Sequence, residues 1–270
     1  MPHDRRVVVH SDPTALADAV AARFVATMIE LLESRETVHV ALTGGSVGID
    51  VLRSIAHRDD LTMIDWGRVH VWWGDERWVG RDHADRNARQ AREALLDHVS
   101  IPAVNVHEFP AADDGVDLEA AAVRYRDELV RAGAGELPRF AITFLGVGPD
   151  GHVASLFPER EGPRIAQATV IAVHDSPKPP AGRLSLSLPL LNLSERVWLV
   201  LAGADKASAL GLALAGASPA DVPVAGVMGT ERTIFFVDEA ASSEVPESLI
   251  IQPEYWTGAM DQPDWSPSAD

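Results

Sequence analysis

The 270-residue sequence predicts an α/β fold with a mostly parallel sheet flanked by helices, and three observations support this prediction. Short apolar runs alternate with longer segments whose apolar residues recur every three or four positions. The run at 140–147 is almost continuously apolar, as in a strand buried on both faces of a parallel sheet. Glycine-rich or charged segments follow several runs, at the positions where open α/β sheets bind ligands. The alternation indicates right-handed β–α–β units.

The elements follow from this pattern in chain order. Asp12 and Pro13 provide a cap and a first-turn proline for the first helix. Leu16, Val20 and Phe24 begin its apolar stripe. Strands are expected at 5–10, 37–42, 68–73, 140–147, 169–173, 184–188, 197–202 and 233–237. Helices are expected at 14–33, 49–57, 87–99, 118–132 and 206–215.

Bulk composition places the chain among globular proteins, with 46% hydrophobic and 23% charged residues. Its apolar runs are shorter than the roughly 20 residues of a membrane span, and its N-terminus lacks the apolar core of a secretory signal. The chain has no cysteine, which excludes disulfides, thiolate metal sites and a cysteine nucleophile. We expect a cytoplasmic protein with one α/β catalytic domain at 1–241 and a polar, proline-containing tail at 242–270.

The formal charge of −17 disfavours a nucleic-acid partner, because such binding depends on cations that replace phosphate counterions. It also repels small anions at long range, so a site for an anionic substrate needs several local cations. Lys178 and Lys206 are the two lysines of the sequence. A metal site is not expected, because the sequence lacks a H-x-x-x-H pair and clustered ligand spacing.

The segment TGGSVG at 43–48 contains G-x-S-x-G directly after a predicted strand. This is the setting of a hydrolase nucleophile elbow, and equally of a turn whose N–H groups bind phosphate. A tight turn without chemistry is the third interpretation. The elbow is disfavoured because no HGG-type oxyanion loop precedes Ser46, and only His152 and His174 lie late in the chain.

The segment GVGPDG at 146–151 formally matches a dinucleotide-binding G-x-G-x-x-G motif. Pro149 removes an N–H from this turn, and Asp150 places a negative charge where a pyrophosphate would lie. The following segment leaves room only for a short helix at 152–157 before Pro158. His152 is the best candidate for a general base, because imidazole titrates near neutral pH.

Charged residues follow other predicted strands. In GDERWVG, Asp75, Glu76 and Arg77 form either a solvated loop or an arginine fork held for an anionic oxygen. Lys178 lies on a proline-rich loop and Arg183 begins the next strand, where a solvated basic loop is an equal alternative. Lys206 lies at a predicted helix start, an unfavourable place for a cation that suggests an anionic partner.

Taken in order, these segments resemble the 6-phosphogluconolactonase family, within the larger group of glucosamine-6-phosphate deaminases and ribose-5-phosphate isomerases. The resemblance runs from about Val38 to Asp238. The GPDGH and ASLFP sequences are its most specific part, whereas deaminases typically have a DEY-like motif in place of DER. The segments that carry it are TGGS, WGDERWV, RNARQAREALL, FLGVGPDGHVASLFP, SPKPPAGRLSLSLPLLN and VLAGADKASAL.

The resemblance implies hydrolysis of 6-phosphoglucono-1,5-lactone to 6-phosphogluconate on a modified Rossmann-like, sugar-phosphate isomerase/deaminase-like fold. It also implies an enzyme without metal or cofactor, whose partner is a small phosphorylated sugar lactone and neither nucleic acid nor membrane. We expect a monomer or weak homo-oligomer. A deaminase or isomerase of the same superfamily, or a non-catalytic sugar-phosphate-binding regulator, is the alternative.

Residue roles carry over position by position from the resemblance. His152 would activate water, with Asp150 orienting it and Arg77 completing the catalytic set. The expected substrate-binding residues are Gly44, Gly45, Ser46, Asp75, Lys178, Arg183 and Lys206. The chain departs from the family at Val47-Gly48, where relatives usually have Thr-Pro, and at Arg86, where they usually have serine.

Overall fold

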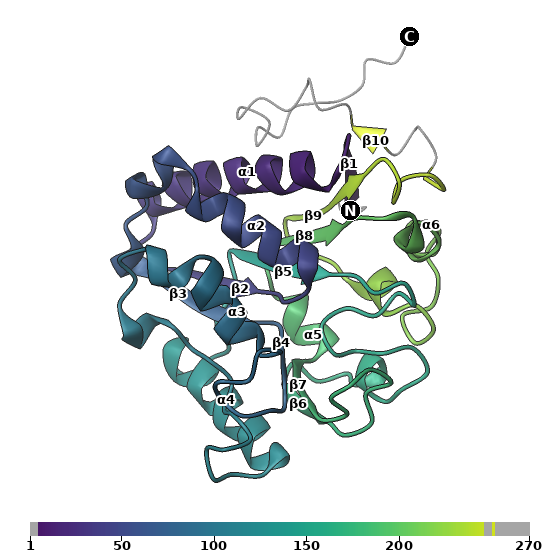
Figure 1. Cartoon of the computed structure of the whole chain (residues 1–270). Coiled ribbons are helices and arrows are strands. Elements are labelled where there is room, and N and C mark those ends of the chain that lie inside the picture. Colours follow the sequence, from purple (N-terminus) through teal and green to yellow (C-terminus); the bar gives the residue numbers. More distant parts are fainter. Residues whose placement is uncertain (1–4, 246–249, 252–270) are drawn as a thin grey trace.

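A seven-stranded parallel sheet forms the centre of the computed structural model, which describes residues 5–245 and 250–251 (Figure 1). Its strand order is β10-β1-β9-β8-β5-β2-β3, and every neighbouring pair is parallel. The predicted parallel sheet is therefore confirmed. The strands are β1 (Arg5–His10), β2 (Val38–Leu42), β3 (Val69–Trp73), β5 (Ile142–Gly146), β8 (Arg196–Leu201), β9 (Arg232–Asp238) and β10 (Ile250–Ile251).

The helices flank this sheet. Helix α1 begins as predicted, because the Asp12 carboxylate accepts hydrogen bonds from the N–H groups of Thr14 and Ala15 at 2.9 Å. Its buried stripe packs against α2 and against strands of the sheet. The helices are α1 (Pro13–Ser34), α2 (Ser46–Ala56), α3 (Asn87–Ala94), α4 (Leu118–Ala132), α5 (Leu188–Leu191) and α6 (Ala207–Leu214).

A second, three-stranded antiparallel sheet lies beside the parallel one, in the order β4-β7-β6. Strand β4 (Asp75–Arg77) follows β3 after the single residue Gly74, and pairs with β7 (Arg183–Leu186). The other neighbour of β7 is β6 (Val170–Val173). The sequence predicted β6 and β7 as strands, but not that they leave the parallel sheet, and it did not predict β4.

Several predicted elements differ from the structure. Helix α2 begins at Ser46 rather than at residue 49, so the second half of TGGSVG is already helical. Helix α3 ends at Ala94, because Leu95 leaves the helical conformation with φ −144° and ψ −53°. The segment 152–157, expected as a short helix, forms turns and isolated bridges.

The expected tail at 242–270 lies mostly outside the described residues. Within it, Ile250–Ile251 forms β10, which pairs with β1 and was not predicted. No helix in the part of the chain that the structure describes is long and apolar enough to cross a membrane.

The chain reverses direction across the sheet between β2 and β5. From β2 it continues outward to β3, whereas from β5 it continues through β8 and β9 toward the other edge. The ends of the two strands are joined where the N–H of Gly146 donates to the Thr43 hydroxyl at 3.2 Å. Such a reversal opens a crevice at the carboxyl ends of parallel strands, where ligands bind in folds of this class.

Candidate active site

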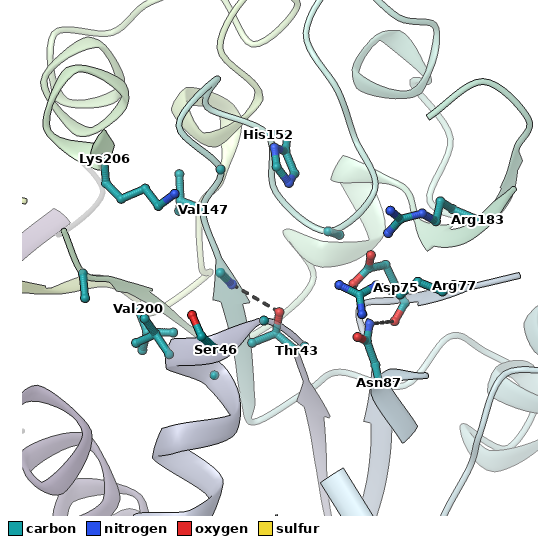
Figure 2. Close-up of a pocket in the computed structure, with 18 of the residues that line it drawn as sticks. Thr43, Ser46, Asp75, Arg77, Asn87, Val147, His152, Arg183, Val200 and Lys206 are labelled. Atoms are coloured by element: carbon teal, nitrogen blue, oxygen red, sulfur yellow. Dashed lines mark hydrogen bonds between the residues drawn. The ribbon is translucent and has the colours of Figure 1, made fainter. Parts of the chain in front are cut away.

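A cavity of about 390 Å³ lies at this reversal point (Figure 2). The loops that follow β2, β3, β5 and β8 surround it, so residues of TGGSVG, GDERWVG, GVGPDG and the turn at Lys206 converge. Of the predicted site residues, Asp150 and Lys178 do not line the cavity, and both contact His152 instead. The predicted residues that line it are Gly44, Gly45, Ser46, Asp75, Arg77, His152, Arg183 and Lys206.

The floor of the cavity is the start of α2. Gly45 is the N-cap residue with a φ of 84°, a left-handed conformation that favours glycine. Residues Ser46, Val47 and Gly48 form the first turn, whose N–H groups have no partner within the helix. A Cβ on Gly48 would lie 2.8 Å from the Thr43 methyl group, so glycine permits this close approach. The helix start can therefore bind an anion.

Ser46 is not arranged as a nucleophile. No histidine in the described residues is hydrogen-bonded to it, and His152 is instead bonded to Asp150 on another loop. A serine nucleophile needs a base within hydrogen-bond reach. This geometry favours the anion-binding interpretation of TGGSVG over the nucleophile elbow.

His152 points into the cavity from the loop after β5 (Figure 2). Its Nδ1 is hydrogen-bonded to the Asp150 carboxylate. The loop closes tightly around this pair, because a Cβ on Gly148 would lie 1.9 Å from His152 Nδ1 and 2.4 Å from Asp150 Oδ1. Gly148 of GVGPDG thus makes room for a histidine–carboxylate pair rather than for a pyrophosphate.

Asp150 is an ionised partner for this histidine. Burial alone would raise its pKa, but the hydrogen bond to His152 and the charges of His152 and Lys178 lower the pKa to about 2. Lys178 Nζ lies 3.7 Å from Asp150 Oδ1 and 3.4 Å from His152 Nδ1. An ionised carboxylate at Nδ1 favours the tautomer with its proton on Nδ1, which leaves Nε2 as an acceptor.

Buried polar groups form the opposite wall. The Asp75 side chain, which is 6% exposed, accepts a hydrogen bond from the Ser155 hydroxyl at 2.7 Å. The side-chain amide of Asn87 donates to the Asp75 carbonyl at 2.9 Å. Arg77 donates to the Asp85 carbonyl at 2.7 Å and also lines the cavity.

Arg183 is the buried cation of this wall. It donates to the carbonyls of Lys178, Pro179 and Pro180 at 2.9–3.2 Å. Burial lowers its pKa, and the Asp75 carboxylate opposes this effect. Carbonyl oxygens hold the guanidinium in place without neutralising its charge, so Arg183 offers a fixed positive charge to the cavity.

Lys206 lies on the far side of the cavity, on the turn before α6. The anionic partner expected for it is Asp205, whose carboxylate accepts a hydrogen bond from Nζ at 2.7 Å. The Asp205 side chain is 60% exposed whereas that of Lys206 is 19% exposed. An ion pair whose carboxylate is exposed to solvent is weak, so a bound anion can compete for the ammonium group.

Sequence reasoning missed four polar residues that structure this site. Thr43, Asn87 and Asp205 line the cavity, and Ser155 lies behind it against Asp75. Asn87 and Ser155 stand within the quoted motifs RNARQ and ASLFP, but only the fold shows that both contact Asp75. In the described part of the chain, no group of three or more histidine or acidic side chains could hold a metal ion.

Several known proteins are similar to this chain. The family model for glucosamine-6-phosphate isomerases/6-phosphogluconolactonase matches residues 11–236. The chain is 45% identical to the 6-phosphogluconolactonase of Streptomyces coelicolor, over 90% of this chain and 96% of the relative. It is 40% identical to that of Mycobacterium tuberculosis, over 89% of this chain and 98% of the relative.

Solved structures show the same fold. The 6-phosphogluconolactonase of Thermotoga maritima matches 87% of this chain and all of its own, with a TM-score of 0.77 and 30% identity. A monomeric glucosamine-6-phosphate deaminase matches 88% of this chain and 99% of its own, with a TM-score of 0.73. Its identity is 19%, so that likeness concerns the fold alone.

Proposed function

The chain belongs to the family of glucosamine-6-phosphate isomerases and 6-phosphogluconolactonases, and we propose that it hydrolyses 6-phosphoglucono-1,5-lactone to 6-phosphogluconate. This reaction is the second step of the oxidative pentose phosphate pathway. The observation that carries the proposal is the His152–Asp150 pair, which faces a cavity lined by Arg77, Arg183 and Lys206. A lactone is an activated ester, so a base and an oxyanion stabiliser suffice for its hydrolysis.

His152 acts as the general base in this proposal. Its Nε2 takes a proton from water, and the water oxygen forms a bond to the lactone carbonyl carbon. The ionised Asp150 stabilises the imidazolium that results. When the tetrahedral intermediate collapses, the bond between this carbon and the ring oxygen breaks, and the imidazolium returns the proton to that oxygen.

The cations lie at two ends of the cavity, so they can bind different parts of the substrate. Lys206 and Ser46 lie on one side, Arg77 and Arg183 lie on the other, and His152 lies between them (Figure 2). We assign the phosphate to the first turn of α2 and Lys206, because a helix start and a lysine both attract a dianion. The oxyanion is then stabilised from the side of Arg77 and Arg183.

The remaining predicted residues support this arrangement. Gly44 and Gly45 let the substrate approach the start of α2, and Asp75 faces the sugar from the opposite wall. Lys178 holds Asp150 beside His152. In this proposal the enzyme works in the cytoplasm as a monomer or weak homo-oligomer and needs no cofactor.

The test follows the decay of 6-phosphogluconolactone above its spontaneous rate. We expect wild-type protein to accelerate decay, and His152→Ala to lose about 100- to 10,000-fold in kcat. The matched control is His174→Ala, because His174 is exposed and bonded to Glu119 rather than facing the cavity. No acceleration by wild type contradicts the proposed function, and glucosamine-6-phosphate turnover instead would favour a deaminase. Full activity of His152→Ala contradicts only the identity of the base.

A further inference from the structure

Strand β4 carries three charged side chains that point in two directions. Asp75 and Arg77 line the cavity, whereas Glu76 between them is 1% exposed and does not reach the cavity. Alternation along a strand places neighbouring side chains on opposite faces. Glu76 is therefore a buried acid directly behind the wall of the site.

The Glu76 carboxylate fastens β4 to the start of α3. It accepts hydrogen bonds from the backbone N–H of Arg77 at 2.8 Å, of Asn87 at 2.7 Å and of Ala88 at 2.9 Å. Asn87 is the first residue of α3, and its side chain bonds to the Asp75 carbonyl. The acid of β4 thus satisfies two N–H groups at the start of α3 and sets the position of Asn87.

Asn87 has a buried polar atom packed against the Gly44 turn. Its Oδ1 is buried without a hydrogen-bond partner, although the residue lines the cavity. A Cβ on Gly44 would lie 1.9 Å from this oxygen. A small displacement of α3 would therefore alter both the wall at Asn87 and the close approach of Gly44 in the substrate-binding turn.

Arg86 is the charge partner of Glu76. Its side chain is 0% exposed, and its Nε lies 3.9 Å from Glu76 Oε2. The guanidinium also donates to the Phe109 carbonyl at 2.6 Å. A buried carboxylate is stable only when a nearby charge and hydrogen bonds compensate for its lost hydration.

We propose that Arg86 is a positioning residue of the active site, whose buried guanidinium supplies the positive charge beside the Glu76 carboxylate, so that Glu76 holds Arg77 and the start of α3 in place. It acts through Glu76 and does not contact the substrate. The proposal depends on the proposed function only because lactone hydrolysis is the reaction used to measure it. Its structural basis is the chain of contacts from Arg86 through Glu76 to the start of α3.

The charges around Glu76 come from several elements. Burial raises the pKa of Glu76, and Arg86 and the three backbone N–H groups lower it. The charge of Glu76 also acts on the pKa of Arg183 on β7 and of Tyr125 on α4. The charges of Asp75, Arg77 and Asp85 act on the pKa of Arg183 as well. The net effect is a raised pKa, and loss of the Arg86 charge shifts the Glu76 pKa further upward.

The experiment compares Arg86→Lys with Arg86→Gln, which differ in charge more than in size. Both are measured for kcat and KM between pH 5 and 8. We expect Arg86→Gln to lose about 10- to 100-fold in kcat/KM at pH 5.5, and to recover part of this loss at pH 8, because a higher pH favours the carboxylate form of Glu76. Arg86→Lys keeps the wild-type pH profile. Adding Glu76→Gln to Arg86→Gln removes the pH dependence of the loss, because no carboxyl remains to titrate.

One further measurement and a control variant separate the inference from the proposed function and from general instability. Amide hydrogen exchange of Asn87 and Ala88 does not depend on turnover, and it accelerates in Arg86→Gln more than in Arg86→Lys. Arg92→Met is the control, because Arg92 lies on the same helix, is 40% exposed and pairs with Glu108. If Arg86→Gln does not fold, the single variant Glu76→Gln must raise KM and accelerate the hydrogen exchange of the Asn87 and Ala88 amides.

Identical pH profiles for the lysine and glutamine variants would overturn the inference. So would wild-type kinetics and wild-type amide exchange in Glu76→Gln. Absence of lactone hydrolysis by the wild type would contradict the proposed function instead, and the exchange measurement would still decide the role of Arg86.

Discussion

Two histidines in this molecule are each hydrogen-bonded through Nδ1 to a carboxylate, but their surroundings differ. His152 is bonded to Asp150 at the cavity. His107 is bonded to Glu128 at 2.7 Å near the β3 edge of the parallel sheet, and its Nε2 lies 3.0 Å from Nδ1 of His70. The second pair is covered by rings, because His107 stacks on Trp72 with ring centroids 3.8 Å apart. A paired histidine is a candidate base only where its second nitrogen faces space for a substrate.

The charged and ionisable groups around His152 also differ from those around His107. The ionised Asp150 and the ammonium of Lys178 both lie beside His152. In the edge cluster of His39, His70 and His107, burial lowers the pKa of His39 and of His70, and the neighbouring imidazoles lower both further. Burial and neighbouring rings therefore favour the neutral forms of His39 and His70. His152 instead lies beside an ionised carboxylate and faces the cavity.

The largest difference is expected when each carboxylate is neutralised. Asp150→Asn should lower kcat by about 100- to 1,000-fold, because an amide can hold the wrong tautomer and cannot stabilise the imidazolium. Glu128→Gln should leave kcat within about twofold, since His107 lies outside the cavity. The measurement is lactone hydrolysis at saturating substrate. Equal losses in the two variants would contradict the distinction between the pairs.

A smaller effect, on stability, should appear at the edge cluster in acid. The folded-state pKa of His39 is lowered to about 4 from 6.5, so the unfolded chain binds more protons between these two values. The stability that neutral His39 contributes is complete above about pH 6.5 and is lost as the pH falls toward 4. The shift corresponds to at most about 3 kcal/mol.

Urea unfolding at pH 7 and at pH 4.5 measures this loss. His39→Gln should reduce the difference in unfolding free energy between the two pH values by about 1–3 kcal/mol. Gln can still accept the hydrogen bond that Trp72 Nε1 donates to His39 Nδ1 at 3.0 Å. The control is His98→Gln, because His98 is exposed. An unchanged pH dependence in His39→Gln would show that the edge cluster does not destabilise the protein in acid.

Features that depend on neighbouring residues could be predicted from the sequence. The parallel strands and the capped first helix follow from local patterns, because burial on both faces and the Asp12–Pro13 start each leave a trace in neighbouring residues. The convergence of the four loops follows from the rule that parallel strands end at one edge. The pairing of Asp150 with His152 was expected from the family resemblance, and the two residues are hydrogen-bonded within one short turn.

The remaining features depend on contacts between distant segments. Strand β4 has three charged residues and becomes a strand only by pairing with β7, about a hundred residues later. In the sequence, Arg86 was only a departure from the family's usual serine, whereas the fold buries it against Glu76. The bond from Ser155 to Asp75 joins residues 80 positions apart. Polar residues buried through such pairing have no periodic signal in the sequence.

The smallest expected effect concerns Ser46, where the two interpretations of TGGSVG differ most clearly. Ser46→Ala should raise KM by about threefold and leave kcat nearly unchanged, because it removes one hydroxyl from an anion site whose backbone N–H groups remain. A nucleophile would instead lose nearly all turnover and would react with a fluorophosphonate probe. The probe should leave wild-type protein unlabelled. A matched substitution, Lys206→Met, should raise KM more than Ser46→Ala does, because it removes a full charge from the same end of the cavity. A larger effect on kcat than on KM in Ser46→Ala would place Ser46 at the reacting carbon rather than at the phosphate.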